Sequence, residues 1–411
     1  MNKKNNKGLV ILSQYFYPEV ASTGQLLTEL AEDLVKYGCK IIVYTGKPSY
    51  YGNIKEYKKR EIYHGIEIYR LFNTTLNKNN KLGKILNSLS YFISIIFKLL
   101  SSKDRYPLLI VSNPPFLPMA GFLFKKIKNQ KYVFLIHDIY PDIAVRLGYL
   151  KEDSFIVKIW NKINYMILKN AEEIIVLGEY MAEILEKKYL PIDNIKIKII
   201  HNWADEKIIL PLKKEDNWFV KRYNLENKLV ILYSGNIGLF QDLKTIINAA
   251  VRLKKFKEIL FLFIGDGGGL SKLKEIVQEN YLTNVKFLPY QPKEYLPYSL
   301  TASDISVVAL EKGVEGLGVP CKIYGILASG CAVLGLVGND CEVTDIIKNA
   351  KCGFRVDQGD VDSLVKKIKY IHKNPGLLKD MGKNSRRYFE KHFTRSQMTK
   401  KYYEILENIE L

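Results

Sequence analysis

Short runs of Val, Ile and Leu recur along this chain, and longer segments with helical periodicity separate them. The runs are continuous rather than alternating with polar residues, which is typical of strands buried on both faces of a parallel sheet. A repeated order of strand, helix and strand predicts a doubly wound α/β fold. With 411 residues, the chain is also too long for one core of ordinary size. We therefore expect two domains of this kind.

The apolar runs predict two sets of strands with helices between them. In the first half the expected strands are Leu9–Ser13, Ile41–Thr45, Ile66–Leu71, Leu108–Ser112, Tyr132–His137, Ile174–Leu177 and Ile197–Ile200. The expected helices there are Thr23–Tyr37, Leu82–Leu100, Leu117–Lys128, Ser154–Asn170 and Tyr180–Lys188. In the second half the expected strands are Leu229–Ser234, Leu260–Ile264, Val285–Leu288, Ile305–Ala309 and Ala332–Leu336.

A polar stretch with a proline at 201–227 interrupts this pattern and marks the expected domain junction. We expect an N-terminal domain at 1–200 and a C-terminal domain at 201–385. The helical pattern at the end of the chain has no strand after it, so residues 386–411 are predicted to form a helix that crosses back to the N-terminal domain. Ligands bind outside the carboxyl ends of the strands in doubly wound sheets. Two such rims facing each other across a cleft would suit a two-substrate enzyme.

Charge and cysteine usage narrow the class of protein. The formal net charge is +19, which predicts attraction to an anionic partner such as nucleic acid, an acidic membrane surface or a phosphate-bearing substrate. Lysines spread over solvated faces would need no partner. Five cysteines occur without a CxxC pair, and no secretory signal precedes Leu9, so we expect free thiols in the cytoplasm. The cysteine and histidine spacings predict no metal site.

The stretch Glu315–Lys322 is the most informative local motif. Its two glycines and a proline predict a tight loop that leads into a helix, so several backbone N–H groups would point at one place. The positive end of the helix dipole suits a phosphate, and Lys322 adds a full charge there. Glu315 supplies an acceptor for sugar hydroxyls. The motif would hold a sugar nucleotide; the alternative is an ordinary loop before a buried helix.

A second motif, Tyr15–Glu19, leads from the first strand to a helix. Ser22 or Thr23 could cap that helix, and Gly24 would let a bulky anion approach the backbone. The alternative is a capped helix and nothing more.

His137 and Asp138 end another predicted strand, and a proline follows them closely. His137 would hydrogen-bond a sugar hydroxyl, and Asp138 would orient an incoming alcohol or receive its proton. The alternative is a packed strand-end histidine, with Asp142 capping the next helical turn.

Three further turns follow strands of the second half: Ser234–Gly238, Gly265–Gly269 and Pro289–Pro292. The glycine cluster of the second turn is similar to a dinucleotide fingerprint, but a ribose-binding acid about 20 residues further on is missing. The third turn could present backbone groups to the edge of a base. Plain loops are the alternative for each.

The segment from Lys78 to Lys103 has five lysines and no acid. One helical face within it consists of apolar residues, namely Leu82, Ile85, Leu86, Leu89, Ile93, Ile96 and Leu100, whereas Lys84, Tyr91 and Lys98 lie on the other. This pattern is short and charged for a bilayer span, but it suits a helix that lies on an anionic membrane. The alternative is an amphipathic helix that faces the core.

Taken together, these motifs resemble those of the retaining glycosyltransferases of family 4, which have the GT-B fold. The resemblance covers essentially the whole chain. Its motifs are YFYPE with Gly24, HDIYPD, YSGNIG, IGDGG, PYQP, and GVPCK through ILASG. Within the family, the chain is similar to bacterial transferases for O-antigen, capsule and colanic-acid sugars, such as N-acetyl-fucosaminyl transferases.

The resemblance implies two Rossmann-like domains, an N-terminal one for the acceptor and a C-terminal one for the nucleotide sugar. It also implies roles for individual residues. His137 would touch the donor sugar, and Asp138 would orient the acceptor. The remaining donor-binding positions would be Gly24, Gly235 and Asn236 at the diphosphate, Gly265 elsewhere in the donor site, Tyr290 and Gln291 by the base, and Glu315, Gly316, Leu317, Gly318 and Val319 at the sugar.

Two departures from the family pattern matter. Many members have an arginine and a lysine after the glycine of the YSG turn, where this chain has Asn236 and Gln241. Many also have a second glutamate that binds ribose, where this chain has Ile323 or, in another alignment, Gly325. Lys322 therefore becomes the candidate for the missing diphosphate charge.

The resemblance implies the reaction and its partners. The donor would be a nucleoside diphosphate sugar, with UDP favoured over GDP, and its sugar an N-acetylated hexosamine or deoxyhexosamine. The acceptor would be a saccharide, including one linked to a polyprenyl diphosphate, at the inner face of the cell membrane. No DxD-like acid pair stands in a suitable place, so we expect no metal and no cofactor.

Two other functions fit parts of the sequence. A non-hydrolysing UDP-sugar epimerase shares the fold, but it needs several acids around the sugar and the second-half turns offer few. A nucleic-acid-binding protein would explain the charge, but the basic residues are dispersed and no binding module is evident. We therefore expect no nucleic acid as a partner.

Overall fold

The computed structural model describes residues 7–19, 21–48, 57–76, 81–189, 197–238 and 240–409 of the chain. The chain divides into two compact units. The N-terminal unit consists of Met1–His201 and Ser396–Leu411, and the C-terminal unit is Asn202–Arg395. Most of the segment before Leu9 lies outside the described residues, as does Lys78.

An eight-stranded sheet forms the centre of the N-terminal unit, with the strand order β3-β4-β2-β1-β5-β6-β7-β8. All neighbouring strands are parallel except β3, which runs antiparallel to β4. The strands are β1 Gly8–Ser13, β2 Lys40–Thr45, β3 Arg60–Tyr63, β4 Ile66–Arg70, β5 Leu108–Val111, β6 Tyr132–Ile136, β7 Glu173–Val176 and β8 Ile197–Ile199. The seven strands predicted here are confirmed. The sequence missed β3, an edge strand that carries Arg60 and Glu61 and has no buried apolar run.

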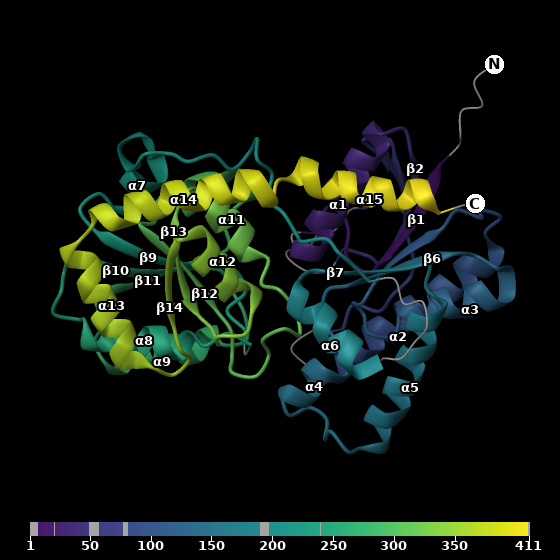
Figure 1. The fold of residues 1–411 in the computed structure, drawn as a ribbon, viewed down its shortest axis with the longest axis horizontal. Helices are drawn as coiled ribbons and strands as arrows, with labels where there is room; N and C mark the ends of the chain where they lie inside the picture. Colours follow the sequence, from purple (N-terminus) through teal and green to yellow (C-terminus); the bar gives the residue numbers. More distant parts are fainter. Residues whose placement is uncertain are drawn as a thin grey trace. The chain divides into compact units, whose positions relative to one another are not determined.

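Helices cover both faces of this sheet. They are α1 Ser22–Lys36, α2 Lys81–Ser101, α3 Pro118–Lys128, α4 Asp142–Arg146, α5 Phe155–Asn170, α6 Glu179–Tyr189 and the last helix of the chain, α15 Arg395–Asn408. α1 and α15 lie side by side on one face (Figure 1), where Tyr402 of α15 and Leu34 of α1 meet Leu9 and Leu109 of the sheet. Thr399 donates a hydrogen bond to Asp33 at 3.2 Å, which fastens α15 to α1.

The C-terminal unit has a six-stranded sheet in the order β11-β10-β9-β12-β13-β14, and all its strands are parallel. Its strands are β9 Leu229–Ser234, β10 Ile259–Ile264, β11 Val285–Leu288, β12 Ile305–Ala309, β13 Ala332–Leu336 and β14 Gly353–Val356. The five strands predicted here are confirmed. The edge strand β14 was missed because its four residues, which include Gly353 and Arg355, are mostly half-buried and form no apolar run.

The helices of this unit are α7 Trp218–Tyr223, α8 Leu243–Arg252, α9 Leu270–Glu279, α10 Leu296–Thr301, α11 Lys322–Ala328, α12 Glu342–Ala350, α13 Val361–Lys373 and α14 Gly376–His392, with short 3₁₀ turns at Lys214–Asp216 and Lys293–Tyr295. One face of the sheet packs on α8, α9 and α13, which bury Ile247, Leu273 and Ile368. Figure 1 shows α8 and α9 on this side, whereas α11 and α14 lie on the opposite side. Two doubly wound sheets, one in each unit, confirm the predicted fold class.

The end of the chain differs from the prediction of one helix at 386–411. Two helices are present: α14 ends at His392 in the C-terminal unit, and α15 then runs through the N-terminal unit. Between them Thr394 pairs with Ala204 as an isolated β-bridge, and Arg395 donates its N–H to the Ala204 carbonyl at 3.1 Å. Those backbone bonds interrupt the helical pattern, so the periodicity of the sequence alone could not show the break.

Helix α2 packs on its unit in an unexpected orientation. Asn87, Tyr91, Ile95 and Leu99 are buried, and the Tyr91 hydroxyl donates to the Tyr44 carbonyl at 2.8 Å. The predicted apolar face points outward instead: Leu82, Ile85, Leu86, Leu89, Ile93 and Leu100 are all exposed, as is Phe97. By length and composition alone Leu82–Ser101 could cross a membrane, although a core helix can pass the same test. The alternative of a core-facing apolar stripe is therefore wrong.

Candidate functional site

Two glycine turns interlock at the carboxyl ends of β9 and β10. Gly235 donates its N–H to the Ile264 carbonyl at 2.9 Å, and Ile237 donates to the Asp266 carbonyl at 2.9 Å. Gly265 has a φ of +145°, and a Cβ there would lie 1.9 Å from the carbonyl oxygen of Gly235. Because no side chain fits at that distance, this position requires glycine. The two turns thus form one hydrogen-bonded backbone surface at the carboxyl ends of these strands, which we call the glycine floor.

Lys322, the first residue of α11, lies directly on this floor. Its Nζ and Cε would each be 3.6 Å from a Cβ built on Gly235, 87 residues away in the chain. The strand β9 leads into the turn and the loop after β12 leads into α11, so neighbouring strands bring the two residues together. The sequence predicted both as diphosphate-binding residues, and the structure places the Lys322 side chain next to the Gly235 turn.

Tyr233 completes this arrangement, although sequence reasoning did not name it as a site residue beyond its place in the YSGNIG motif. Lys322 Nζ lies 2.6 Å from the Tyr233 hydroxyl and 3.8 Å from the centre of its ring. The hydroxyl in turn donates to the Asn236 carbonyl at 2.6 Å. Burial raises the pKa of Tyr233 well above its usual range, so the phenol stays protonated.

The charge of Lys322 is only weakly compensated. Among the residues that the structure describes, no carboxylate lies within ion-pair distance of its Nζ. Desolvation lowers the pKa of Lys322 to about 7, because burial disfavours the charged amine. An anionic ligand at the Gly235 turn would restore the charged form.

Asn236 directly follows Gly235 in the first glycine turn, and its contact with the diphosphate stays a prediction. Its backbone carbonyl accepts the Tyr233 hydrogen bond, and its exposed side chain lies between Gly238 of its own turn and Gly267 of the neighbouring turn. A Cβ on Gly267 would lie 2.7 Å from Asn236 Oδ1, and one on Gly238 would lie 2.6 Å from Nδ2. Gln241 also serves this turn, because its Oε1 accepts the Gly238 N–H at 3.0 Å.

Tyr290 and Gln291 follow β11, the edge strand beside β10. Gly265 donates its N–H to the Leu288 carbonyl at 3.0 Å, which brings their turn next to the glycine floor. Gln291 donates from Nε2 to the Pro289 carbonyl at 2.8 Å. Their turn thus lies beside the two glycine turns, and their contact with a base stays a prediction.

Glu315 connects three loops of the C-terminal unit. Its Oε2 accepts the Gly313 N–H at 2.6 Å, and its Oε1 accepts the Gly338 N–H at 3.3 Å and a hydrogen bond from the Gln358 amide. An ionised carboxylate has about four acceptor positions, so at most about one is left for a sugar hydroxyl. Glu315 thus anchors its loop, and sequence reasoning missed its partner Gln358.

The residues after Glu315 present backbone rather than side chains. Leu317 and Val319 are only 5% and 6% exposed, so their side chains face the interior. Gly316 has a φ of +72°, which favours glycine at this turn. Gly318 lies between the two buried side chains, and this loop leads to Lys322 at the start of α11.

In the N-terminal unit, three chain segments meet at the ends of β5, β6 and the start of α1. Ser112 Oγ accepts the backbone N–H of His137 at 3.0 Å and that of Asp138 at 3.2 Å. Thr23 Oγ1 lies 3.4 Å from His137 Nδ1. The sequence predicted His137 and Asp138 but missed Ser112, although a serine directly after a buried strand stands at the same rim.

The start of α1 also corrects one expectation. Its cap position is Ala21 and no side chain caps the helix, so neither Ser22 nor Thr23 has the predicted capping role. Thr23 contacts His137 instead. Gly24 is buried, and a Cβ there would lie 3.4 Å from backbone atoms of Tyr15 and Phe16. This distance is an ordinary van der Waals contact, so packing alone does not require glycine here, and a contact with the diphosphate stays a prediction.

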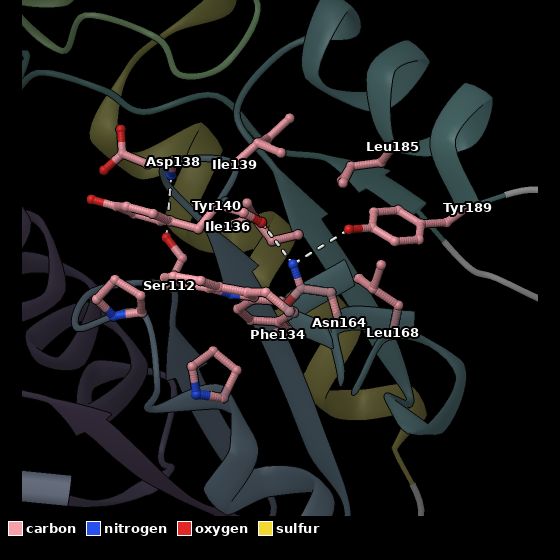
Figure 2. Close-up of a pocket in the computed structure, with 13 residues that line it drawn as sticks. Ser112, Phe134, Ile136, Asp138, Ile139, Tyr140, Asn164, Leu168, Leu185 and Tyr189 are labelled. Atoms are coloured by element: carbon pink, nitrogen blue, oxygen red, sulfur yellow. Dashed lines mark hydrogen bonds between the residues drawn. The ribbon is translucent and has the colours of Figure 1, made fainter. Parts of the chain in front are cut away.

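A narrow pocket opens beside Asp138 (Figure 2), with walls that are mainly apolar and aromatic. The rings of Tyr140 and Trp160 are almost parallel, at 5°, with centres 6.0 Å apart. Asn164 Nδ2 donates to the Tyr140 carbonyl at 2.6 Å and fixes that wall. The sequence missed Trp160 and Asn164 because both lie on α5 and have the spacing of ordinary helix residues.

Desolvation acts in opposite directions on the two titratable groups here. It raises the pKa of Asp138 to about 6 and lowers the pKa of His137 to about 4. His137 is therefore neutral at pH 7 and can serve as a hydrogen-bond partner rather than as a cation. In the described part of the chain, no group of three or more His, Cys, Asp or Glu side chains could hold a metal ion.

Known proteins resemble this chain in both sequence and fold. The model of Glycosyltransferase Family 4 matches residues 23–207, and that of Glycosyl transferases group 1 matches residues 214–388. The probable glycosyltransferase WbjE of Pseudomonas aeruginosa is 30% identical over 72% of this chain and 73% of its own length. The putative colanic acid biosynthesis glycosyl transferase WcaI of Escherichia coli K12 is 26% identical over 77% of this chain and 79% of its own.

Solved structures show the same fold over nearly the full length. Sucrose-phosphate synthase from Thermosynechococcus elongatus has a TM-score of 0.76 at 16% identity and covers 98% of both chains. HepE from Anabaena, in complex with UDP and glucose, has a TM-score of 0.73 at 13% identity over 98% of this chain and 99% of its own. The fold is GT-B, that of two-domain glycosyltransferases. This chain belongs to glycosyltransferase family 4 and is a glycosyltransferase.

Proposed function

We propose that this enzyme transfers a sugar, with retention of anomeric configuration, from a nucleoside diphosphate donor to an acceptor hydroxyl. The observation that carries the proposal is the position of Lys322, whose ammonium lies on the Gly235 turn without a carboxylate partner among the described residues. A weakly compensated cation beside a floor of glycine backbone suits a diphosphate.

In the proposed reaction, negative charge develops on the leaving diphosphate as the glycosidic bond breaks. Lys322 would stabilise that charge, and electrostatic stabilisation by preorganised groups is usually the largest single contribution to catalysis. The leaving phosphate oxygen takes the proton of the acceptor hydroxyl, so no separate base is required. Glu315 holds the backbone of the sugar-binding loop in place. Neutral His137 would hydrogen-bond the donor sugar, and Asp138 would orient the acceptor.

The relatives support the choice of substrates. HepE was solved with UDP and with UDP-glucose, and a further GT-B neighbour, WaaG, is involved in lipopolysaccharide biosynthesis. WcaI is assigned to colanic acid biosynthesis. We therefore favour UDP over GDP in the donor, an N-acetylated hexosamine or deoxyhexosamine as the sugar, and a polyprenyl-diphosphate-linked saccharide as the acceptor, in bacterial surface polysaccharide biosynthesis.

The pocket of the N-terminal unit supports an acceptor in this part of the chain (Figure 2). Aromatic walls with a few polar groups are typical of binding sites for small organic molecules. Asp138 lies at this pocket and could accept a hydrogen bond from a hydroxyl group.

A screen of sugar nucleotides for thermal stabilisation tests the donor assignment. A ligand at one hundred times its dissociation constant should add about 2.7 kcal/mol to the unfolding free energy. UDP-sugars should stabilise the protein more than GDP-sugars, and NMR of the product should show the anomeric configuration of the donor. Chelation of divalent ions should leave turnover unchanged. An inverted product, or an epimerised donor in the absence of acceptor, would contradict the proposal.

The outer face of α2 supports peripheral binding to the inner face of the cell membrane. Leu82 and Phe97 are 67% and 68% exposed, and the rest of the predicted apolar face between Leu82 and Leu100 is exposed or half-buried. Lys84 and Lys103 are exposed close to it, and the chain as a whole carries a charge of +19. An apolar face with nearby lysines is typical of helices that bind anionic bilayers.

Vesicle flotation tests this surface. The protein should float with vesicles that contain phosphatidylglycerol and much less with phosphatidylcholine alone. The double variant Ile93→Ser, Phe97→Ser should reduce partitioning by more than about tenfold, because each buried apolar side chain contributes about 1.5–3 kcal/mol. Tyr370→Ser, at a half-exposed residue of α13, is the control. Unchanged flotation of the double variant would contradict a membrane contact, as would a stable dimer that the same variant dissociates.

A further inference from the structure

The ammonium of Lys322 is oriented by a chain of two hydrogen bonds. The first joins Lys322 Nζ to the Tyr233 hydroxyl at 2.6 Å. In the second, the hydroxyl donates its only proton to the Asn236 carbonyl at 2.6 Å. With that proton engaged, the hydroxyl oxygen faces Lys322 as an acceptor. An ammonium has three N–H donors, so two are left for a ligand.

The ring of Tyr233 restricts the lysine further. Lys322 Nζ lies 3.8 Å from the ring centre, within the range of a cation–π contact. Tyr233 is 1% exposed and belongs to β9, so the ring cannot follow a moving lysine. The same chain of contacts ends on the carbonyl of Asn236, the residue after Gly235. The Tyr233 side chain therefore contacts both the lysine and the backbone of the turn. A long side chain held this way loses little further rotamer freedom when a ligand arrives.

We propose that Tyr233 is a positioning residue for the donor diphosphate: its hydroxyl, fixed by the Asn236 carbonyl, holds the Lys322 ammonium over the Gly235 turn. This inference rests on the proposed function, because it takes the diphosphate as the ligand of Lys322. Tyr233 itself need not touch the ligand. Its effect on the reaction passes through Lys322.

A double-mutant cycle with UDP as the probe tests this role. In the wild-type background, Tyr233→Phe keeps the ring but removes the hydroxyl, and should weaken UDP binding about tenfold, as expected for a lost hydrogen bond to a charged group. In the Lys322→Met background the same change should alter the Kd by less than about twofold, because the interaction it affects is already gone. Titration calorimetry on the full chain gives all four values.

A second measurement separates positioning from a structural effect. The Tyr233 oxygen favours the charged form of Lys322 by accepting a hydrogen bond from its ammonium, so Tyr233→Phe should lower the pKa of the lysine. The rise of the UDP Kd at alkaline pH should therefore begin at lower pH in the variant. Tyr91→Phe is the matched control, because Tyr91 is a buried tyrosine whose hydroxyl also donates to a backbone carbonyl. Tyr91→Phe should leave both the Kd and its pH dependence unchanged.

The outcomes are distinguishable. An equal effect of Tyr233→Phe in both backgrounds would overturn the inference, because Tyr233 would then act on the turn alone. If Tyr233→Phe does not fold, Lys322→Arg replaces it: the charge is kept, the position is changed, and an unaltered Kd would overturn the inference. If Lys322→Met leaves the Kd unchanged, or if neither UDP nor GDP binds the wild-type protein, the proposed donor site itself is wrong.

Discussion

At the scale of single residues, burial rather than charge pairing sets the properties of the candidate site. Lys322, His137 and Asp138 all have shifted pKa values, and desolvation is the first cause for each. A titratable side chain that is desolvated without a strong charge partner lowers the free energy of unfolding of the protein. Such side chains are concentrated at functional sites.

Asp138→Asn tests this account through the pH dependence of stability. The pKa of Asp138 is raised to about 6 in the folded state, above its value of about 4 in the unfolded chain. Between these two values the folded state binds more protons, so the Asp138 contribution to stability falls as pH rises from 4 to 6. Asn has no such dependence. The variant should therefore match the wild type near pH 4 and be more stable by about 2 kcal/mol at pH 7.

Urea unfolding at both pH values measures this difference. Equal stabilities at pH 7 would show that Asp138 is well solvated or paired, and its proposed part in the site would lose its physical basis. The exposed residue Asp153, changed to Asn in the same way, is the control, and it should show no such difference.

At the scale of elements, the glycine floor between β9 and β10 is the feature that the sequence indicated least clearly. A cluster such as Gly265–Gly269 has several meanings in sequence, and only the register of two strands shows which glycines meet. Ser234 pairs with Ile264, so the two turns begin at the same level of the sheet. Gly265 then meets the Gly235 carbonyl, whereas Gly268 has open space around it.

Gly265→Ala and Gly268→Ala are therefore a matched pair. At Gly265 the added Cβ would lie 1.9 Å from a backbone oxygen at a φ of +145°, so the floor must deform. We expect UDP affinity to fall by at least about tenfold and stability by about 1–3 kcal/mol. Gly268→Ala should leave both quantities near the wild-type values. Calorimetry and urea unfolding measure them, and similar behaviour of the two variants would show that the turns do not depend on the close approach.

Most elements could be predicted from sequence because their signal is local. Buried strands such as β12, Ile305–Ala309, appear as apolar runs, and the prediction was correct to the residue. The edge strands β3 and β14 lack that signal because they contain charged residues and form no apolar run, whereas the edge strands β8 and β11 were still predicted. Tyr233 was missed as a site residue for a related reason: in sequence it is one more apolar residue of a buried strand, and only the fold reveals its contact with Lys322.

At the scale of the whole molecule, the chain forms two doubly wound units, and its last segment, Ser396–Leu411, returns to the N-terminal unit. After α14 of the C-terminal unit, α15 completes the N-terminal unit, where Tyr402 is 3% exposed against the sheet. The sequence predicted the return but placed it at 386 rather than 395, because a single bridge at Thr394 causes the break. The hydrogen bonds of Glu315 were equally beyond prediction, because its partners Gly313, Gly338 and Gln358 lie in loops that follow three different strands.

The most direct test of the central claim is the turnover of Lys322→Met, measured with the donor that stabilises the wild-type protein most. Loss of one preorganised group that stabilises developing charge typically lowers turnover by about a hundredfold or more. Lys348→Met, at an exposed lysine on α12, is the control and should retain wild-type turnover. The account predicts at least that hundredfold loss for Lys322→Met in a folded protein. A loss of less than about threefold would contradict the assignment of Lys322 as the cation of the donor diphosphate.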